Sequence, residues 1–152
     1  MDIRQMKLVQ KSFAQVLLVA DTTVDLFYAR LFELDPALRG MFPQDMTVQK
    51  QKFMSMLNTA VDSLDRLDNL VPTIQALGIR HRTYGVTVEQ YDSVREALMW
   101  ALQESLGDQF TPEVKAAWVA VITLLANTMQ QAAGYFSQSN EPARMAGDAA
   151  KR

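Results

Sequence analysis

Hydrophobic residues recur at helical spacing along almost the whole chain, and no segment alternates apolar and polar residues with the period of a strand. The first predicted helix presents on one face Leu8, Phe13, Val16 and Leu17. The second presents Val24, Phe27, Tyr28, Leu31 and Phe32. The pattern predicts an all-α protein with about seven helices of unequal length, which disfavours a simple four-helix bundle.

Capping signals and helix breakers set the expected boundaries. Residues 21–23 are expected to cap the second helix, and a short segment starts at residues 35–36 and ends at residues 41–43. A long helix that begins at residues 45–47 directs inward Gln49, Phe53, Met56, Leu57, Ala60 and Leu64. The acidic stretch 62–68 is interpreted as a solvated loop. The remaining helices are expected at about residues 70 to 82, 88 to 106 and 111 to 131.

The length of 152 residues is that of one domain, which we place at residues 1–136. The polar, proline-broken tail 137–152 is expected to be disordered. The chain has 15 basic and 17 acidic residues and no basic block, which argues against nucleic-acid binding. Its lack of cysteine excludes disulfides, thiolate catalysis and zinc–thiolate sites. With no signal-like N-terminus and no apolar run near roughly 18 residues, we expect a soluble cytoplasmic protein without a membrane partner.

His81 is the only histidine, so a soft metal held by the protein has a single strong nitrogen ligand available. Haem brings four nitrogens of its own and needs one protein ligand, so a lone histidine suffices for it. The alternative is a structural histidine that makes a hydrogen bond on a half-apolar helix. The nine methionines are expected to fill gaps in the core, with Met54 and Met56 remaining as alternative ligands.

Five sequence blocks occur in an order that resembles the globins, specifically the single-domain bacterial globins related to the haem domain of flavohaemoglobins. The blocks are residues 27–32, 35–42, 49–53, 77–86 with 91–94, and 110–118, and the resemblance covers residues 2 to about 133. It implies a globin fold around haem b. It also implies that His81 is the proximal iron ligand and that Gln49 lies on the distal side.

The same resemblance implies roles around the haem. Phe42 would stack on the ring, and Lys52 and Arg80 would pair with the propionates, whereas Lys50 and Gln51 are expected to be solvated. The proximal side would be walled by Leu77, Val86, Tyr91 and Val94. Because a ligating imidazole is neutral and needs an acceptor for its second nitrogen, we expect the Leu77 carbonyl, one helical turn back, to accept from His81.

On the distal side, Tyr28 and Gln49 would both donate hydrogen bonds to a bound gas, which predicts tight O2 binding. The alternatives are that Tyr28 is a core residue and that Gln49 belongs to an ordinary solvated helix start. The chain departs from the family pattern at two positions. Phe53 replaces a smaller aliphatic residue and is expected to shrink the distal pocket, and Ala133 stands where related flavohaemoglobins carry a glutamate.

The leading functional hypothesis is a five-coordinate haem protein that binds O2, and also CO and NO, reversibly for storage or delivery. The alternative is a nitric oxide dioxygenase that depends on an external reductase. A gas or redox sensor and a haem-free helical module are further alternatives. We expect a monomer or a weak dimer.

Overall fold

The computed structural model describes residues 1–134, which form six α-helices and three short 3-10 helices with no strand among them. The all-α prediction is therefore confirmed. The elements are α1 (Ile3–Leu17), α2 (Ala20–Leu34), η1 (Pro36–Met41), α3 (Thr47–Asp62), η2 (Leu64–Leu70), α4 (Val71–Thr83), α5 (Val88–Leu106), η3 (Gly107–Gln109) and α6 (Pro112–Ala132). The predicted tail 137–152 lies outside the described residues.

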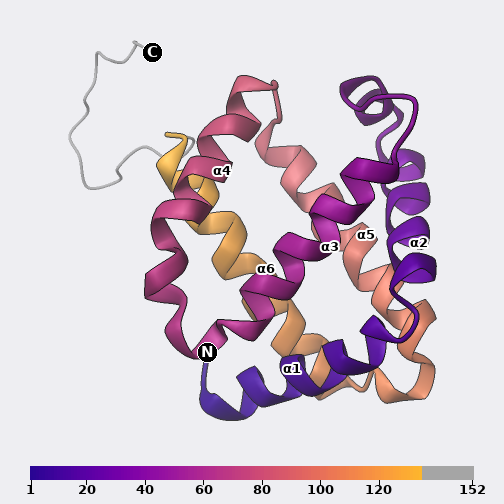
Figure 1. Ribbon diagram of the computed structural model, residues 1–152, viewed down its shortest axis with the longest axis vertical. Coiled ribbons are helices and arrows are strands. Elements are labelled where there is room, and N and C mark those ends of the chain that lie inside the picture. The colour runs from indigo at the N-terminus through magenta and orange to yellow at the C-terminus, as the bar shows by residue number, and fades with distance from the viewer. Residues whose placement is uncertain (135–152) are drawn as a thin grey trace.

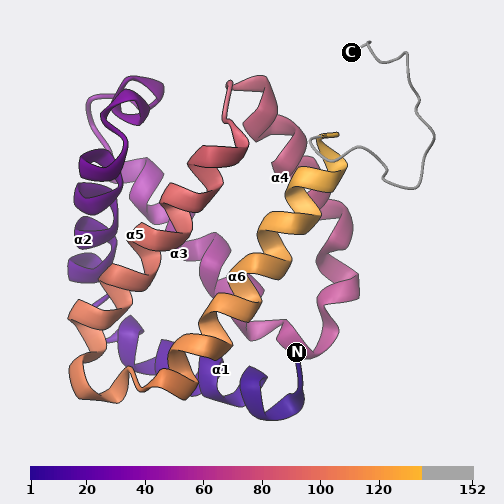
Figure 2. The same ribbon diagram turned by 180° about the vertical axis from the view of Figure 1, so that it is seen from behind.

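The helices pack in crossing pairs. Helix α2 packs on α5, α4 packs on α6, and α5 and α6 pack on each other. Helix α1 runs across the lower end of the molecule in Figure 1 and contacts α6 and α3. Helix α3 crosses in front of α5 and α6 in this view, and Figure 2 shows α5 and α6 from behind. Helix α3 thus runs from the side of α2 across the molecule to η2, which leads into α4, while α4 lies beside α6.

The centre of the core lies where α1 meets α6. Trp118 is completely buried there, and its ring centroid lies 5.9 Å from that of Phe13. The indole nitrogen of Trp118 donates a 2.8 Å hydrogen bond to the hydroxyl of Ser12, so the buried polar atom is satisfied. Full burial of each large apolar side chain stabilises the fold by about 1.5–3 kcal/mol.

The start of the second helix differs from the prediction that residues 21–23 cap it. Helix α2 begins at Ala20, and Val19 precedes it without a side-chain capping bond. The hydroxyl of Thr23 makes a 2.6 Å hydrogen bond with that of Ser105 and also bonds the Val19 carbonyl. The Thr23 side chain thus makes a tertiary contact with α5 and does not cap the start of the helix.

Two further expectations are corrected. Leu17, predicted to face the core, is 45% exposed because α1 ends there and the chain turns away. The stretch 62–68, interpreted as a loop, contains most of η2, in which Leu64 is buried and Arg66 breaks the helical geometry. Among the described helices, none has the length and apolar character needed to cross a membrane.

Candidate functional site

His81 lies near the C-terminal end of α4, and its ring is held in a defined orientation. Nδ1 of the imidazole lies 2.8 Å from the Leu77 carbonyl oxygen, one helical turn back, as the sequence predicts. Because a carbonyl only accepts hydrogen bonds, Nδ1 carries the proton in this contact. Nε2 is then the nitrogen available to a metal.

The surroundings of His81 favour the neutral imidazole. Burial lowers the pKa of His81 below its ordinary value of 6.5, and the nearby positive charge of Arg80 lowers it further. The hydrogen bond to Leu77 acts in the opposite direction but is outweighed by burial. At neutral pH the ring is therefore unprotonated at Nε2, the form that can bind iron, so His81 fits the chemistry of a haem ligand.

Two contacts fix the position of α4 on α6. Gly78, one turn before His81, lies against the backbone of Met129, and an added Cβ atom would overlap the Met129 carbonyl group. The guanidinium of Arg82 donates a 2.7 Å hydrogen bond to the carbonyl of Ala133, the residue that caps α6. Ala133 stands where the resemblance implies a glutamate in related flavohaemoglobins. Its backbone carbonyl thus helps to hold α4 against α6.

Two residues of the expected proximal wall lie close to His81. The buried ring of Tyr91 has its centroid 6.4 Å from that of the imidazole. The backbone nitrogen of Val86 donates a 3.1 Å hydrogen bond to the His81 carbonyl. Leu77 and Val94 are half-buried, and Val94 packs against the hydrophobic core.

Tyr28 on α2 and Gln49 on α3, which the sequence predicts to lie on the distal side, are brought into direct contact. The amide nitrogen of Gln49 donates a 3.1 Å hydrogen bond to the Tyr28 hydroxyl oxygen. Burial raises the pKa of Tyr28, and the bond from Gln49 offsets this only in part. The phenol therefore stays protonated at neutral pH and keeps its own hydrogen to donate.

Aromatic rings surround Tyr28. Phe53 stacks on Phe27 with a centroid distance of 4.4 Å and an interplanar angle of 9°. The ring of Tyr28 meets Phe53 edge-on at 5.8 Å and Phe42 at 5.6 Å. Phe53 and Phe42 thus both contact the ring of Tyr28, and the stack on Phe27 holds the Phe53 ring in place.

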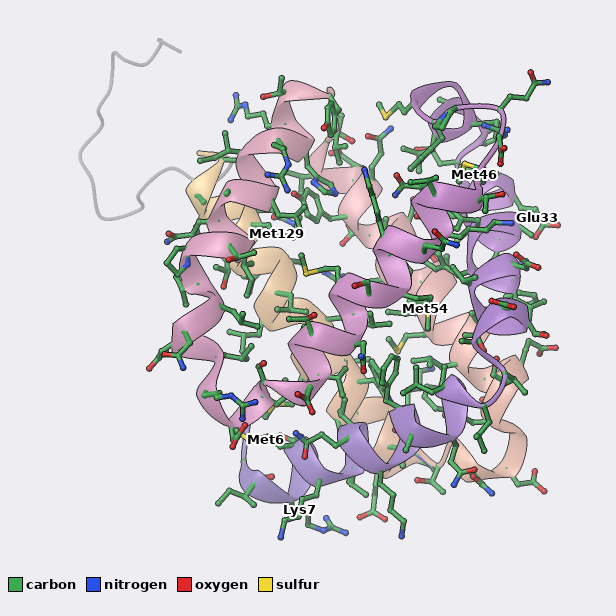
Figure 3. The ribbon with its side chains drawn as sticks, viewed as in Figure 1. Met6, Lys7, Glu33, Met46, Met54 and Met129 are labelled. Carbon is green, nitrogen blue, oxygen red and sulfur yellow. The ribbon has the colours of Figure 1, made fainter. Side chains whose placement is uncertain are left out.

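The structure also places the charged and sulfur-containing residues. Lys52 and Arg80 are exposed on α3 and α4, and their role toward propionates stays a prediction. Met54 packs against the hydrophobic core, which supports its role as a gap filler. In Figure 3 the side chains of Met54 and Met129 lie between helices, whereas Lys7 points outward from α1.

Lys50 does not have the solvated position expected for it. Its side chain is half-buried, and its ammonium lies 2.8 Å from the carboxylate of Asp25 on α2. The chain carries no sequence signal for this pair, because 25 residues separate its members and no helical spacing relates them. Asp25 is therefore a residue of the site region that sequence reasoning missed.

The globin family model matches residues 25–129 of the chain. A flavohemoprotein from Bacillus subtilis is 30% identical over 110 residues, which are 70% of this chain and 28% of that protein. A neuroglobin from Danio rerio is 31% identical over 116 residues, which are 67% of this chain and 73% of that protein. The chain thus spans less than a third of the flavohemoprotein and about three quarters of the neuroglobin.

Among solved structures, a bacterial globin from Campylobacter jejuni is similar in fold, with a TM-score of 0.77 at 18% identity. The similarity covers 88% of this chain and 97% of that one. This similarity shows a globin fold, and the family match and the neuroglobin relative show the family. The chain therefore belongs to the globin family and is a haem protein.

Proposed function

We propose that this globin holds haem b through Nε2 of His81 and binds O2 reversibly, with Tyr28 and Gln49 retaining the gas. The observation that carries the proposal is the hydrogen bond between Gln49 and Tyr28, which joins two donor side chains from different helices. Haem, when bound, supplies an iron with an open coordination position that takes O2, CO or NO.

On the proximal side the protein supplies a neutral, oriented imidazole. The Leu77 carbonyl holds the proton on Nδ1, so Nε2 has no proton to lose when it binds a metal. Tyr91 and Val86 lie beside the imidazole and would help to exclude water from it. Lys52 and Arg80 would hold the propionates at the exposed edge, and Phe42 would stack on the ring.

On the distal side the protein supplies hydrogen bonds. Tyr28 accepts from Gln49 and keeps its own hydrogen for a ligand. A hydrogen bond to a charged acceptor is worth about 1.5–3 kcal/mol. This energy corresponds to a roughly ten- to hundredfold slower release of the gas. The pair therefore favours tight binding and slow dissociation.

An optical titration tests the proposal. The full chain is reconstituted with haem and reduced, and its absorption spectrum is recorded with CO, O2 and NO. We expect a five-coordinate ferrous spectrum that shifts reversibly with each gas. His81→Ala should lose haem affinity and the native spectrum, whereas Thr83→Ala, a change two positions away, should keep both. Native haem affinity in His81→Ala would overturn the proposal.

A second function is favoured by the similarity to the flavohemoprotein of Bacillus subtilis. It is a nitric oxide dioxygenase reaction, in which NO, O2 and one electron give nitrate. The electron would come from a separate reductase that uses a nicotinamide cofactor. Sustained NO consumption with reductase and NADPH would favour this enzyme, and a single stoichiometric oxidation would favour gas binding.

A further inference from the structure

We propose that the ion pair between Lys50 and Asp25 is a positioning pair that maintains the hydrogen bond between Gln49 and Tyr28 and so prolongs the residence of a bound gas. This inference rests on the proposed function of Tyr28 and Gln49. It assigns a role to two residues that do not themselves contact the ligand.

The ion pair and the hydrogen bond connect the same two helices at the same place. Lys50 follows Gln49 directly in α3, and Asp25 precedes Tyr28 by three residues in α2, about one helical turn. The ion pair spans 2.8 Å and the hydrogen bond spans 3.1 Å. Two polar links thus cross from α2 to the first turn of α3, side by side.

The start of α3 is held by an apolar contact as well as by the polar links, because Met46 packs against the hydrophobic core. Met46, the residue before the helix, makes no side-chain capping bond. Asp45 accepts hydrogen bonds from the backbone and hydroxyl of Thr47, but this local turn does not attach α3 to α2. One turn further into α3, the ring of Phe53 stacks on Phe27 of α2. Beside these apolar contacts, the ion pair is a charged link between α2 and α3 directly next to Gln49.

Lys50 is partly buried and Asp25 is exposed, so the expected effect of the ion pair is small. The Lys50 side chain is 30% exposed and that of Asp25 is 63% exposed, so water and salt screen the pair only in part. When the pair is broken, the start of α3 separates from α2 more often and the Gln49–Tyr28 bond is populated less. We expect about a two- to fivefold faster release of O2, the range for a partly exposed ion pair.

The variants needed for the test are Lys50→Met, Asp25→Asn and the exchange of both charges, Asp25→Lys with Lys50→Asp. Arg4→Met is the matched control, because it breaks the exposed ion pair with Glu113 between α1 and α6. The first measurement is amide hydrogen exchange of residues 47–53 in the haem-free full chain. The second is the O2 dissociation rate of the reconstituted ferrous protein.

We expect both single variants to show faster amide hydrogen exchange at residues 47–53 and faster release of O2. The double variant with the two charges swapped should restore both rates. The Arg4→Met control should change neither rate. Salt at about 1 M, which shortens the screening length to about 3 Å, should reproduce the effect in the unaltered protein and not in Lys50→Met. In a Tyr28→Phe background, Lys50→Met should add nothing to the O2 dissociation rate, because the pair acts through the hydroxyl.

Unchanged amide hydrogen exchange at residues 47–53 in the single variants would overturn the inference. It would also be overturned if Lys50→Met raised the O2 dissociation rate as much in the Tyr28→Phe background as in the unaltered protein. Failure of the unaltered chain to bind O2 would instead refute the proposed function. In that case the exchange measurement still decides whether the ion pair holds α3.

Discussion

Gly78 of α4 lies directly against Met129 of α6, so that an added Cβ atom would overlap the carbonyl oxygen, the carbonyl carbon and the Cα atom of Met129. Backbone atoms cannot move aside as the end of a flexible side chain can. This contact therefore sets how closely the helix that carries His81 approaches α6, one turn before the imidazole.

Gly78→Ala should force α4 and α6 apart and lower the free energy of unfolding by about 1–3 kcal/mol, the usual cost of overpacking. The measurement is a urea unfolding curve of the haem-free protein. Gly40→Ala is the matched control, since an added Cβ atom there meets nothing within 4 Å. Equal stability of the two variants would contradict this account of the helix contact.

The pH dependence of stability should reveal the buried imidazole. Because burial lowers the pKa of folded His81 below 6.5, the unfolded chain takes up the proton first as the pH falls. The free energy of unfolding should thus decrease as the pH drops from about 6.5 toward the lower folded pKa, and this contribution should level off below it. His81→Gln should lack this component of the slope in the haem-free protein. If the unaltered protein and His81→Gln showed identical slopes of unfolding free energy against pH, at pH values above those at which carboxylates titrate, the result would argue against a buried neutral imidazole.

Removal of the Tyr28 hydroxyl should speed gas release if Tyr28 holds the bound gas as proposed. Tyr28→Phe keeps the ring that contacts Phe42 and Phe53 but removes the donor, so we expect the O2 dissociation rate to rise roughly ten- to hundredfold. Stopped-flow displacement of O2 by CO measures it. Tyr84→Phe, at an exposed tyrosine, should leave the rate unchanged. An unaltered rate in Tyr28→Phe would remove the tyrosine from the mechanism.

Phe53→Leu should open the distal side. The change removes the stack on Phe27 and the edge contact with Tyr28, which should lower the free energy of unfolding by about 1 kcal/mol. The smaller side chain should also speed CO association, measured after flash photolysis. Slower or unchanged association would show that Phe53 does not restrict ligand entry.

Features governed by local geometry could be predicted from the sequence. Helix α5 spans the predicted residues 88 to 106, because Thr87 and Gln90 form a capping box at its start and Gly107, with a φ of 56°, ends it. The contact of His81 with the Leu77 carbonyl was equally predictable, because residues four apart face each other in a helix.

Features that depend on distant partners could not be predicted. Helix α2 starts before its apparent cap, and Thr23 instead bonds Ser105, which lies 82 residues further along the chain. Lys50 finds Asp25 only once α2 and α3 are packed together. In both pairs, Thr23–Ser105 and Lys50–Asp25, the two residues lie on different helices and are not related by helical periodicity. No local sequence pattern therefore identifies them.

The complete burial of Trp118 has a practical consequence. Its indole is shielded at the α1–α6 contact, whereas Trp100 is half-buried beneath the guanidinium of Arg30. The fluorescence of Trp118 should therefore shift to longer wavelength when the core opens, and haem, which absorbs where tryptophan emits, should quench it by energy transfer. A single emission spectrum would then report both unfolding and cofactor uptake without any added label.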